Sequence, residues 1–139
     1  ENITNVEFIG SVPKEEILNY IAKFDVALIS LRSTPAYKYG ISANKMFEYM
    51  YAKKPILAIY DTDFDDVEDA QCGITLKDPS INEITSTMLK FSKMCNKSLK
   101  AMGENGYNFL LKHYTYDIIA EHYQKLIGEL VKSSSHFKR

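Results

Sequence analysis

Three short, mostly apolar runs constrain the fold of this 139-residue chain most strongly. They cover residues 26–29, 55–60 and 73–76. A run that is apolar at nearly every position fits a strand covered on both faces, which is typical of a parallel sheet. Segments with apolar residues three and four positions apart lie between and after these runs, and they predict helices. The alternation predicts an α/β domain with a Rossmann-like parallel sheet and flanking helices.

The remaining elements follow from local signals. An apolar stretch over 6–9, ending at Gly10, predicts a further strand. Pro13 favours a first helical turn, and apolar spacing continues that helix to about residue 24. Residues 31–38 read as a polar loop. The other predicted helices cover about 44–53, 64–70, 80–94, 97–113 and 116–131, with Gly103 and Gly106 weakening the helix at 97–113.

A loop that opens a short helix carries the strongest functional pattern, Tyr39 to Met50. Gly40 permits an unusual backbone angle. Ser42 and Asn44 are good helix-capping residues. The free N–H groups of such a helix start attract phosphates. Lys45 and Glu48 follow on a polar face, which suits a nucleotide diphosphate: N–H groups and Lys45 for the phosphates, Glu48 for the ribose. A solvated amphipathic helix explains the same residues without a ligand.

The pattern resembles the family-4 (group 1) glycosyltransferases of the GT-B fold, and in particular those that build bacterial capsule and O-antigen sugars. That subgroup carries a tyrosine-glycine-x-serine-x-asparagine-lysine loop, then an acidic residue, then lysine-proline-valine/isoleucine. The matching residues are Tyr39, Gly40, Ser42, Asn44, Lys45, Glu48, Lys54, Pro55 and Ile56. The strands at 5–12, 25–31 and 73–76 also match, so the resemblance covers about 5–131.

The resemblance implies a retaining transfer of a sugar from a nucleotide diphosphate sugar to a glycan or lipid-linked acceptor. It implies a role in cell-surface polysaccharide synthesis and a cytoplasmic location, peripheral at the inner face of the cell membrane. It implies that the enzyme uses no metal or other cofactor. The donor-binding residues that it implies are Gly40, Ile41, Ser42, Asn44, Lys45 and Glu48. It assigns no catalytic residue. The chain departs from the family at two positions: Gly40 stands where a first glutamate is common, and Ala43 replaces a proline.

Only the later part of a GT-B C-terminal domain is matched, over residues 1–132, and we expect 133–139 to be a disordered tail. The acceptor-binding N-terminal domain and the first two strands of the C-terminal domain are not matched. In a Rossmann strand order these two strands lie between the third and the fourth. The strand at 6–9 is therefore expected to pair directly with the strand that starts at Asp25, or a second copy of the chain to cover the exposed edge as a homodimer.

Composition excludes other classes. Seventeen basic and eighteen acidic residues give a net charge of −1, which argues against a nucleic-acid binder that depends on bulk positive charge. No run of eighteen apolar residues predicts a membrane span. Cys72 and Cys95 lack C-x-x-C spacing and are expected to be buried, reduced thiols. His113 and His122 read as ordinary helix residues, and with His136 they show no metal-ligand spacing.

Two non-enzymatic alternatives stay open. A receiver-like signalling module has a similar length, but it needs an acidic cluster after its first strand, and here the aspartates at 61–66 follow a later one. A partner subunit that kept the fold and lost turnover is consistent with Gly40 in place of the usual glutamate. The aspartates also admit a Ca²⁺ loop, although the turn glycine and terminal glutamate of an EF-hand are missing. A solvated acidic loop is the simpler interpretation.

Overall fold

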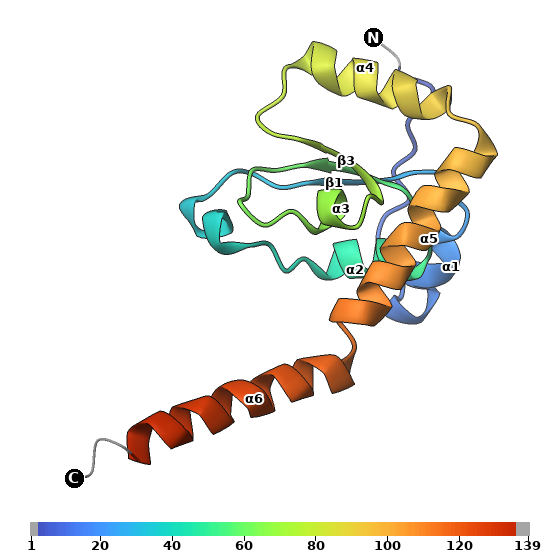
Figure 1. Cartoon of the computed structure of the whole chain (residues 1–139). Coiled ribbons are helices and arrows are strands. Elements are labelled where there is room, and N and C mark those ends of the chain that lie inside the picture. The colour runs from blue at the N-terminus through green and yellow to red at the C-terminus, as the bar shows by residue number, and fades with distance from the viewer. Residues whose placement is uncertain (1–2, 136–139) are drawn as a thin grey trace.

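The computed structural model describes the backbone of residues 3–135. It contains a parallel three-stranded sheet in the order β1-β2-β3, formed by Ala27–Ser30, Ile56–Ile59 and Gly73–Leu76 (Figure 1). Ala27 lies opposite Ile56, and Ile56 lies opposite Gly73. Each strand follows its neighbour along the chain through a helix. This parallel strand–helix–strand arrangement confirms the predicted Rossmann-like α/β fold.

Helices cover both faces of the sheet. Helix α2, Asn44–Tyr51, and the short helix α3, Asp66–Asp69, connect the strands across one face, where α5, Asn96–His113, packs on α2. Helix α4, Ile81–Ser92, lies over the opposite face (Figure 1). A 3₁₀ turn, η1 (Lys14–Glu16), leads into α1 (Ile17–Ile21), and a second 3₁₀ helix, η2 (Pro35–Tyr39), lies within the segment predicted to be a loop.

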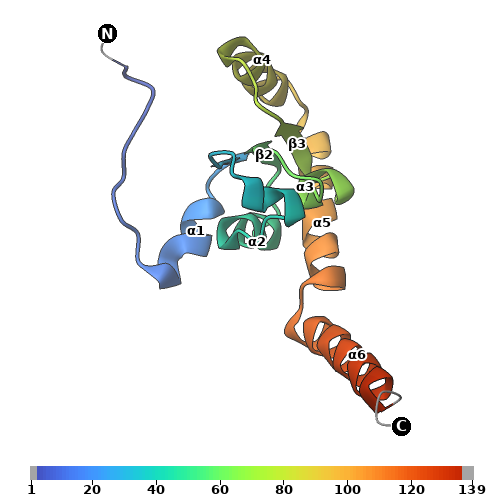
Figure 2. The ribbon, with the colours of Figure 1, turned by 90° about the vertical axis from the view of Figure 1, so that its left-hand side faces the viewer.

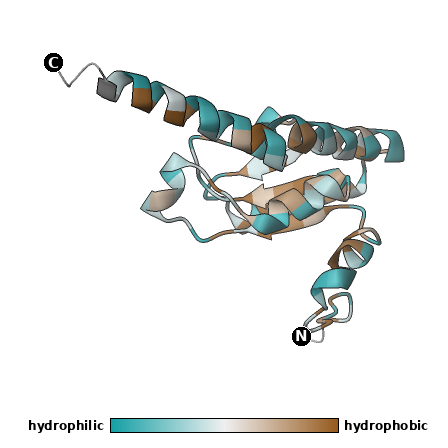
Figure 3. Ribbon diagram, turned by 90° about the horizontal axis from the view of Figure 1, so that it is seen from below, coloured by the Kyte–Doolittle hydropathy of each residue, from teal (hydrophilic) through white to brown (hydrophobic). Residues whose placement is uncertain are grey.

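The core lies between the sheet and α2. Met46 and Met50 of α2 are buried against Ile29 and Ile56. Figure 3 shows the corresponding hydrophobic colouring of the strands beneath the helices. Buried Gly103 and Gly106 let α5 approach this layer closely, since a Cβ at Gly103 would lie 2.0 Å from the carbonyl oxygen of Lys53. The glycines that weaken α5 in isolation are therefore what allows it to pack.

The predicted strand at residues 6–9 is wrong. This segment is exposed and unpaired, and Figure 2 shows it running well away from the sheet. Phe8 is 94% exposed, so the segment gains no burial that would order it as a strand. The prediction that it pairs with the strand after Asp25 is wrong for the same reason. β1 is consequently an edge strand, and a second copy covering that edge stays a prediction.

The last helix, α6, covers Tyr116–Ser135 and projects from the body (Figures 1 and 2). It extends three residues into the segment 133–139 that was expected to be disordered, and 136–139, including His136, lie outside the described residues. Its apolar stripe is largely exposed, with Leu126 and Leu130 at 56% and 66%. The repeat that predicted the helix thus has no packing partner in residues 3–135.

Candidate functional site

The loop before α2 takes the backbone conformation that its glycine permits. Gly40 has φ +112° and ψ 162°, in the region that L side chains rarely adopt. Space is not the constraint, because a Cβ there would meet only the Cβ of Phe64, at 4.0 Å. The loop therefore requires glycine for its path. A glutamate at this position would be strained, which gives a physical reason why the usual acidic residue of the resembled family is replaced.

The predicted capping of α2 by Ser42 or Asn44 is wrong. Ala43 is the N-cap residue, in extended conformation, and no side chain caps the helix. The Met46 N–H donates to the Ala43 carbonyl at 2.9 Å. Within residues 3–135 the N–H groups of Asn44 and Lys45 have no hydrogen-bond acceptor. Such unsatisfied donors concentrate the positive end of the helix dipole at its start.

Lys45 and Glu48 line one groove. It lies between α1 and α2 beside β1, has a volume of about 420 Å³ and is otherwise mostly apolar. Lys45 is exposed and Glu48 is half-buried, and neither side chain has an ion-pair partner in the described part of the chain. Gly40, Ile41, Ser42 and Asn44 do not line this groove; Ile41 packs on the core, and Ser42 and Asn44 are exposed.

Tyr49 also lines the groove, and sequence reasoning did not select it. Its hydroxyl donates to the Leu28 carbonyl of the open β1 edge at 3.5 Å. Burial, and then the negative charge of Glu48, raise the pKa of Tyr49 above its ordinary value. The hydroxyl therefore remains a donor at neutral pH. The sequence does not indicate this role, because it depends on the contact between α2 and β1.

A second cavity of about 420 Å³ lies at the carboxyl ends of the strands, where open α/β sheets bind ligands. Ser33, Tyr60, Asp61 and Asp78 supply its polar lining. None of the predicted site residues contributes to it. Its signal in the sequence is the set of polar residues after the predicted strands: Ser33 and Asp61 lie in predicted loops, and Asp78 precedes the helix predicted from about residue 80.

The aspartates after β2 are not all solvated. Asp61 and Asp63 are exposed, whereas Asp65 is buried and caps α3. Its Oδ1 accepts hydrogen bonds from the Tyr60 hydroxyl at 2.9 Å and the Val67 N–H at 3.0 Å. Burial, and then the Asp65 carboxylate, raise the pKa of Tyr60 well above its ordinary value. Asp65 therefore holds the loop after β2 in place.

Lys54, of the Lys-Pro-Ile match, also has a structural role. Its Nζ donates to the Ala22 carbonyl at 2.7 Å and ties the end of α1 to the turn before β2.

Cys72 is buried as predicted, but Cys95 is exposed, so the prediction of two buried thiols is wrong for Cys95; both are free. His113 and His122 lie in α5 and α6 as predicted.

Comparison with known protein families places the chain in a described family. The model of a family described as glycosyl transferase-like matches residues 1–125. No curated protein and no solved structure matches the chain. Among the described residues, no helix combines the length and apolarity that crossing a membrane requires.

Proposed function

Because the chain belongs to the glycosyl transferase-like family, whose activity is sugar transfer, we propose that it is the donor-binding part of an enzyme of this kind. The donor would be a nucleotide diphosphate sugar, and the closest subgroup the family-4 enzymes of capsule and O-antigen synthesis. The acceptor would be a glycan or a lipid-linked glycan at the cytoplasmic face of the cell membrane. Retention at the transferred sugar is the stereochemistry that this assignment implies.

One observation carries the proposal: the uncapped start of α2 lies next to Lys45 and the unpartnered Glu48. The diphosphate would accept from the N–H groups of Asn44 and Lys45, with the Lys45 ammonium as a further positive charge. Helix N–H groups and a lysine together provide electrostatic stabilisation of a leaving diphosphate.

Glu48 would bind the ribose. It lies four residues beyond Asn44, about 6 Å along the helix axis at 1.5 Å per residue. That is the reach from a phosphate to the ribose hydroxyl pair, and one carboxylate accepts from both hydroxyls. A half-buried carboxylate without a partner is poorly solvated in the free protein, so a pair of donors from the ligand would be favourable.

The acceptor would bind elsewhere. Residues 3–135 form a single three-stranded α/β unit, whereas the resembled enzymes close a second such domain over the donor. The group that activates the acceptor hydroxyl would lie on that second domain. We therefore expect the chain alone to transfer no sugar, and robust turnover of labelled nucleotide sugars by the 139-residue chain would contradict this arrangement.

Isothermal titration calorimetry with uridine and guanosine diphosphates tests the donor site. Glu48→Gln removes the charge but keeps the shape, and losing a charge-assisted hydrogen bond costs about 1.5–3 kcal/mol, or about ten- to a hundredfold in affinity. Glu121→Gln, on the exposed surface of α6, is the matched control and should bind as the wild type does. Equal affinities of the wild type and Glu48→Gln for the nucleoside diphosphates would show that Glu48 does not bind the ribose.

A further inference from the structure

Lysines are concentrated where α4 turns into α5. Residues 84–103 contain Lys90, Lys93, Lys97 and Lys100 but neither aspartate nor glutamate. All four are exposed, and none has a hydrogen-bond or ion-pair partner within the part of the chain that the structure describes. Unpaired like charges this close repel one another. An external anionic partner would offset this repulsion, which gives a physical reason for the clustering.

Three more lysines border the same end of the molecule. We call the whole set the lysine surface, formed by Lys23, Lys53, Lys54, Lys90, Lys93, Lys97 and Lys100. Two neighbouring cavities that share Phe24, Asp25, Asn96 and Leu99 connect its two sides. Lys23 Nζ lies over the Tyr20 ring, and Lys54 Nζ donates to the Ala22 carbonyl.

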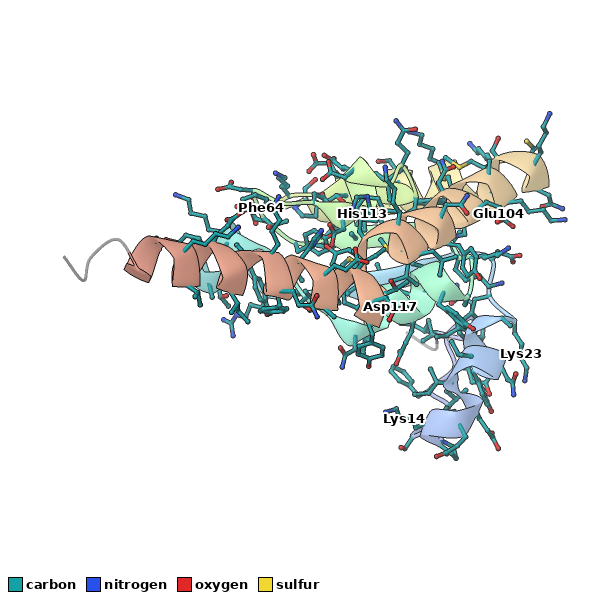
Figure 4. The ribbon with its side chains drawn as sticks, turned by 60° about the horizontal axis from the view of Figure 1, so that its bottom comes forward. Lys14, Lys23, Phe64, Glu104, His113 and Asp117 are labelled. Carbon is teal, nitrogen blue, oxygen red and sulfur yellow. The ribbon has the colours of Figure 1, made fainter. Side chains whose placement is uncertain are left out.

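Two carboxylates face the lysine surface. Glu104 pairs with Lys53 at 2.9 Å, and Asp25 lines the shared cavity wall. Seven lysines against two carboxylates leave five positive charges on a chain whose net charge is −1. Figure 4 shows Lys23 and Glu104 toward one end of the molecule and Phe64, of the loop after β2, toward the other.

Three acidic residues lie at the opposite, carboxyl end of the sheet: Asp61 and Asp63 follow β2, and Asp78 follows β3. The other acidic residues after β2 cap or form α3, which leads back toward the amino end of β3. The lysine surface and these three carboxylates are therefore separated along the strand direction. A molecule with this separation turns its basic end toward a negative surface and its acidic end toward water.

Exposed apolar side chains accompany the lysines. Phe24, Leu28 and Met88 are each 46% exposed and line a groove of about 600 Å³ with Lys23, and Leu89 of α4 is 53% exposed. We propose that the lysine surface binds the surface of an anionic lipid bilayer, with headgroup phosphates at the lysines and these apolar side chains at the hydrocarbon boundary. Basic residues combined with apolar side chains are what interfacial binding uses.

Nucleic acid fits this surface less well. Neither of the two arginines of the chain, Arg32 and Arg139, belongs to the lysine surface. Met88 and Leu89 are aliphatic, so of the exposed apolar side chains named above Phe24 alone offers an aromatic face on which a base could stack. An anionic bilayer can bind both the lysines and the exposed apolar side chains. The proposal depends on surface charge and not on the nucleotide site, so either can fail without the other.

Vesicle co-sedimentation tests the proposal, using phosphatidylglycerol–phosphatidylcholine vesicles and pure phosphatidylcholine vesicles in about 50 mM salt. The triple variant Lys93→Gln, Lys97→Gln, Lys100→Gln should bind the anionic vesicles about a hundredfold more weakly, at about fivefold per lysine. The matched control is Lys14→Gln, Lys38→Gln, Lys125→Gln, which removes the same charge from exposed sites elsewhere. It should bind within about twofold of the wild type.

The expected result also includes release of the wild type by about 0.5 M salt, since screening removes most of the attraction. Three results would overturn the proposal: equal binding to neutral vesicles, equal losses in the two triple variants, or tighter binding to single-stranded DNA than to anionic vesicles. Circular dichroism of both variants checks that they are folded. A triple variant that unfolds is replaced by Lys97→Glu against Lys125→Glu. Reversal at Lys97 changes two charges, so we expect about twenty-fivefold weaker binding for Lys97→Glu and little change for Lys125→Glu.

Discussion

Replacing Gly103 by alanine tests how α5 is held against the rest of the domain. A Cβ at Gly103 would lie 2.0 Å from the oxygen and 2.6 Å from the carbon of the Lys53 carbonyl. The clashing atoms of Lys53 belong to its backbone and not to its flexible side chain. Lys53 has a φ of +56°, which fixes the turn between α2 and β2. The only relief is for α5 to move off α2.

The magnitude follows from two opposing terms. Overpacking in a well-packed region costs about 1–3 kcal/mol, and a clash with backbone belongs at the upper end of that range. Alanine recovers about 0.5–1 kcal/mol through its better helix propensity. We therefore expect Gly103→Ala to destabilise the domain by about 2 kcal/mol, which corresponds to a melting temperature about 8 °C lower for a chain of this size.

Gly128 in α6 is the matched control. A Cβ there has no atom within 4 Å, so Gly128→Ala gains propensity without a clash and should be neutral or stabilising. Urea unfolding followed by far-ultraviolet circular dichroism compares the two variants with the wild type. A Gly103→Ala variant as stable as the wild type or the Gly128→Ala variant would refute the close α2–α5 contact.

Three further predictions concern the loop after β2, alkaline pH and the open edge. Asp65→Ala should cost about 2–3 kcal/mol in urea unfolding, because α3 loses its cap and the buried Tyr60 hydroxyl loses its acceptor; unchanged stability would contradict the network. Burial raises the pKa of Cys72 from 9.0 to about 12 and that of Tyr60 above its usual 10.0. The unfolded chain thus releases these protons first, and stability that is present below pH 9 should fall by up to about 1.4 kcal/mol per pH unit for each group above its unfolded pKa. Tyr60→Phe should reduce that slope above pH 10, and a stability independent of pH up to 11 would exclude the assignment. Light scattering should give twice the mass of one chain, since the outward N–H groups of Leu28 and Ser30 are unpaired at the β1 edge; a monomer at all concentrations would exclude pairing there.

The sequence predicted the three strands of the sheet because each is apolar at most positions, a pattern typical of parallel strands. Burial is nearly complete only in β2, since β1 alternates between buried and exposed residues and β3 is half-buried throughout. The run at 6–9 carries the same local signal, yet it lies unpaired. A strand needs a neighbour as well as β-propensity, and the presence of a neighbour is not encoded in a local pattern.

At the start of α2, too, the sequence predicted some features and missed others. The sequence predicted a helix from about Asn44 and indicated that Gly40 permits an unusual backbone angle; the structure has α2 starting at Asn44 and a positive φ at Gly40. It failed on the caps, because Ser42 and Asn44 have the right chemistry but Ala43 occupies the capping position. The roles of Tyr49 and Asp65 depend on contacts with β1 and α3, so they were out of reach of reasoning from neighbours along the chain.

Backbone amide chemical shifts during titration with a nucleoside diphosphate test the central claim most directly, because they report which N–H groups meet the phosphates even when binding is weak. Uridine diphosphate is the probe, and uridine is the control without phosphates. With uridine diphosphate we expect the largest shifts at Asn44 and Lys45 and smaller shifts at Glu48. With uridine we expect only the shifts at Glu48. Shifts confined to the carboxyl-end cavity, at Ser33 and Asp78, would place the nucleotide there and contradict the assignment to the start of α2.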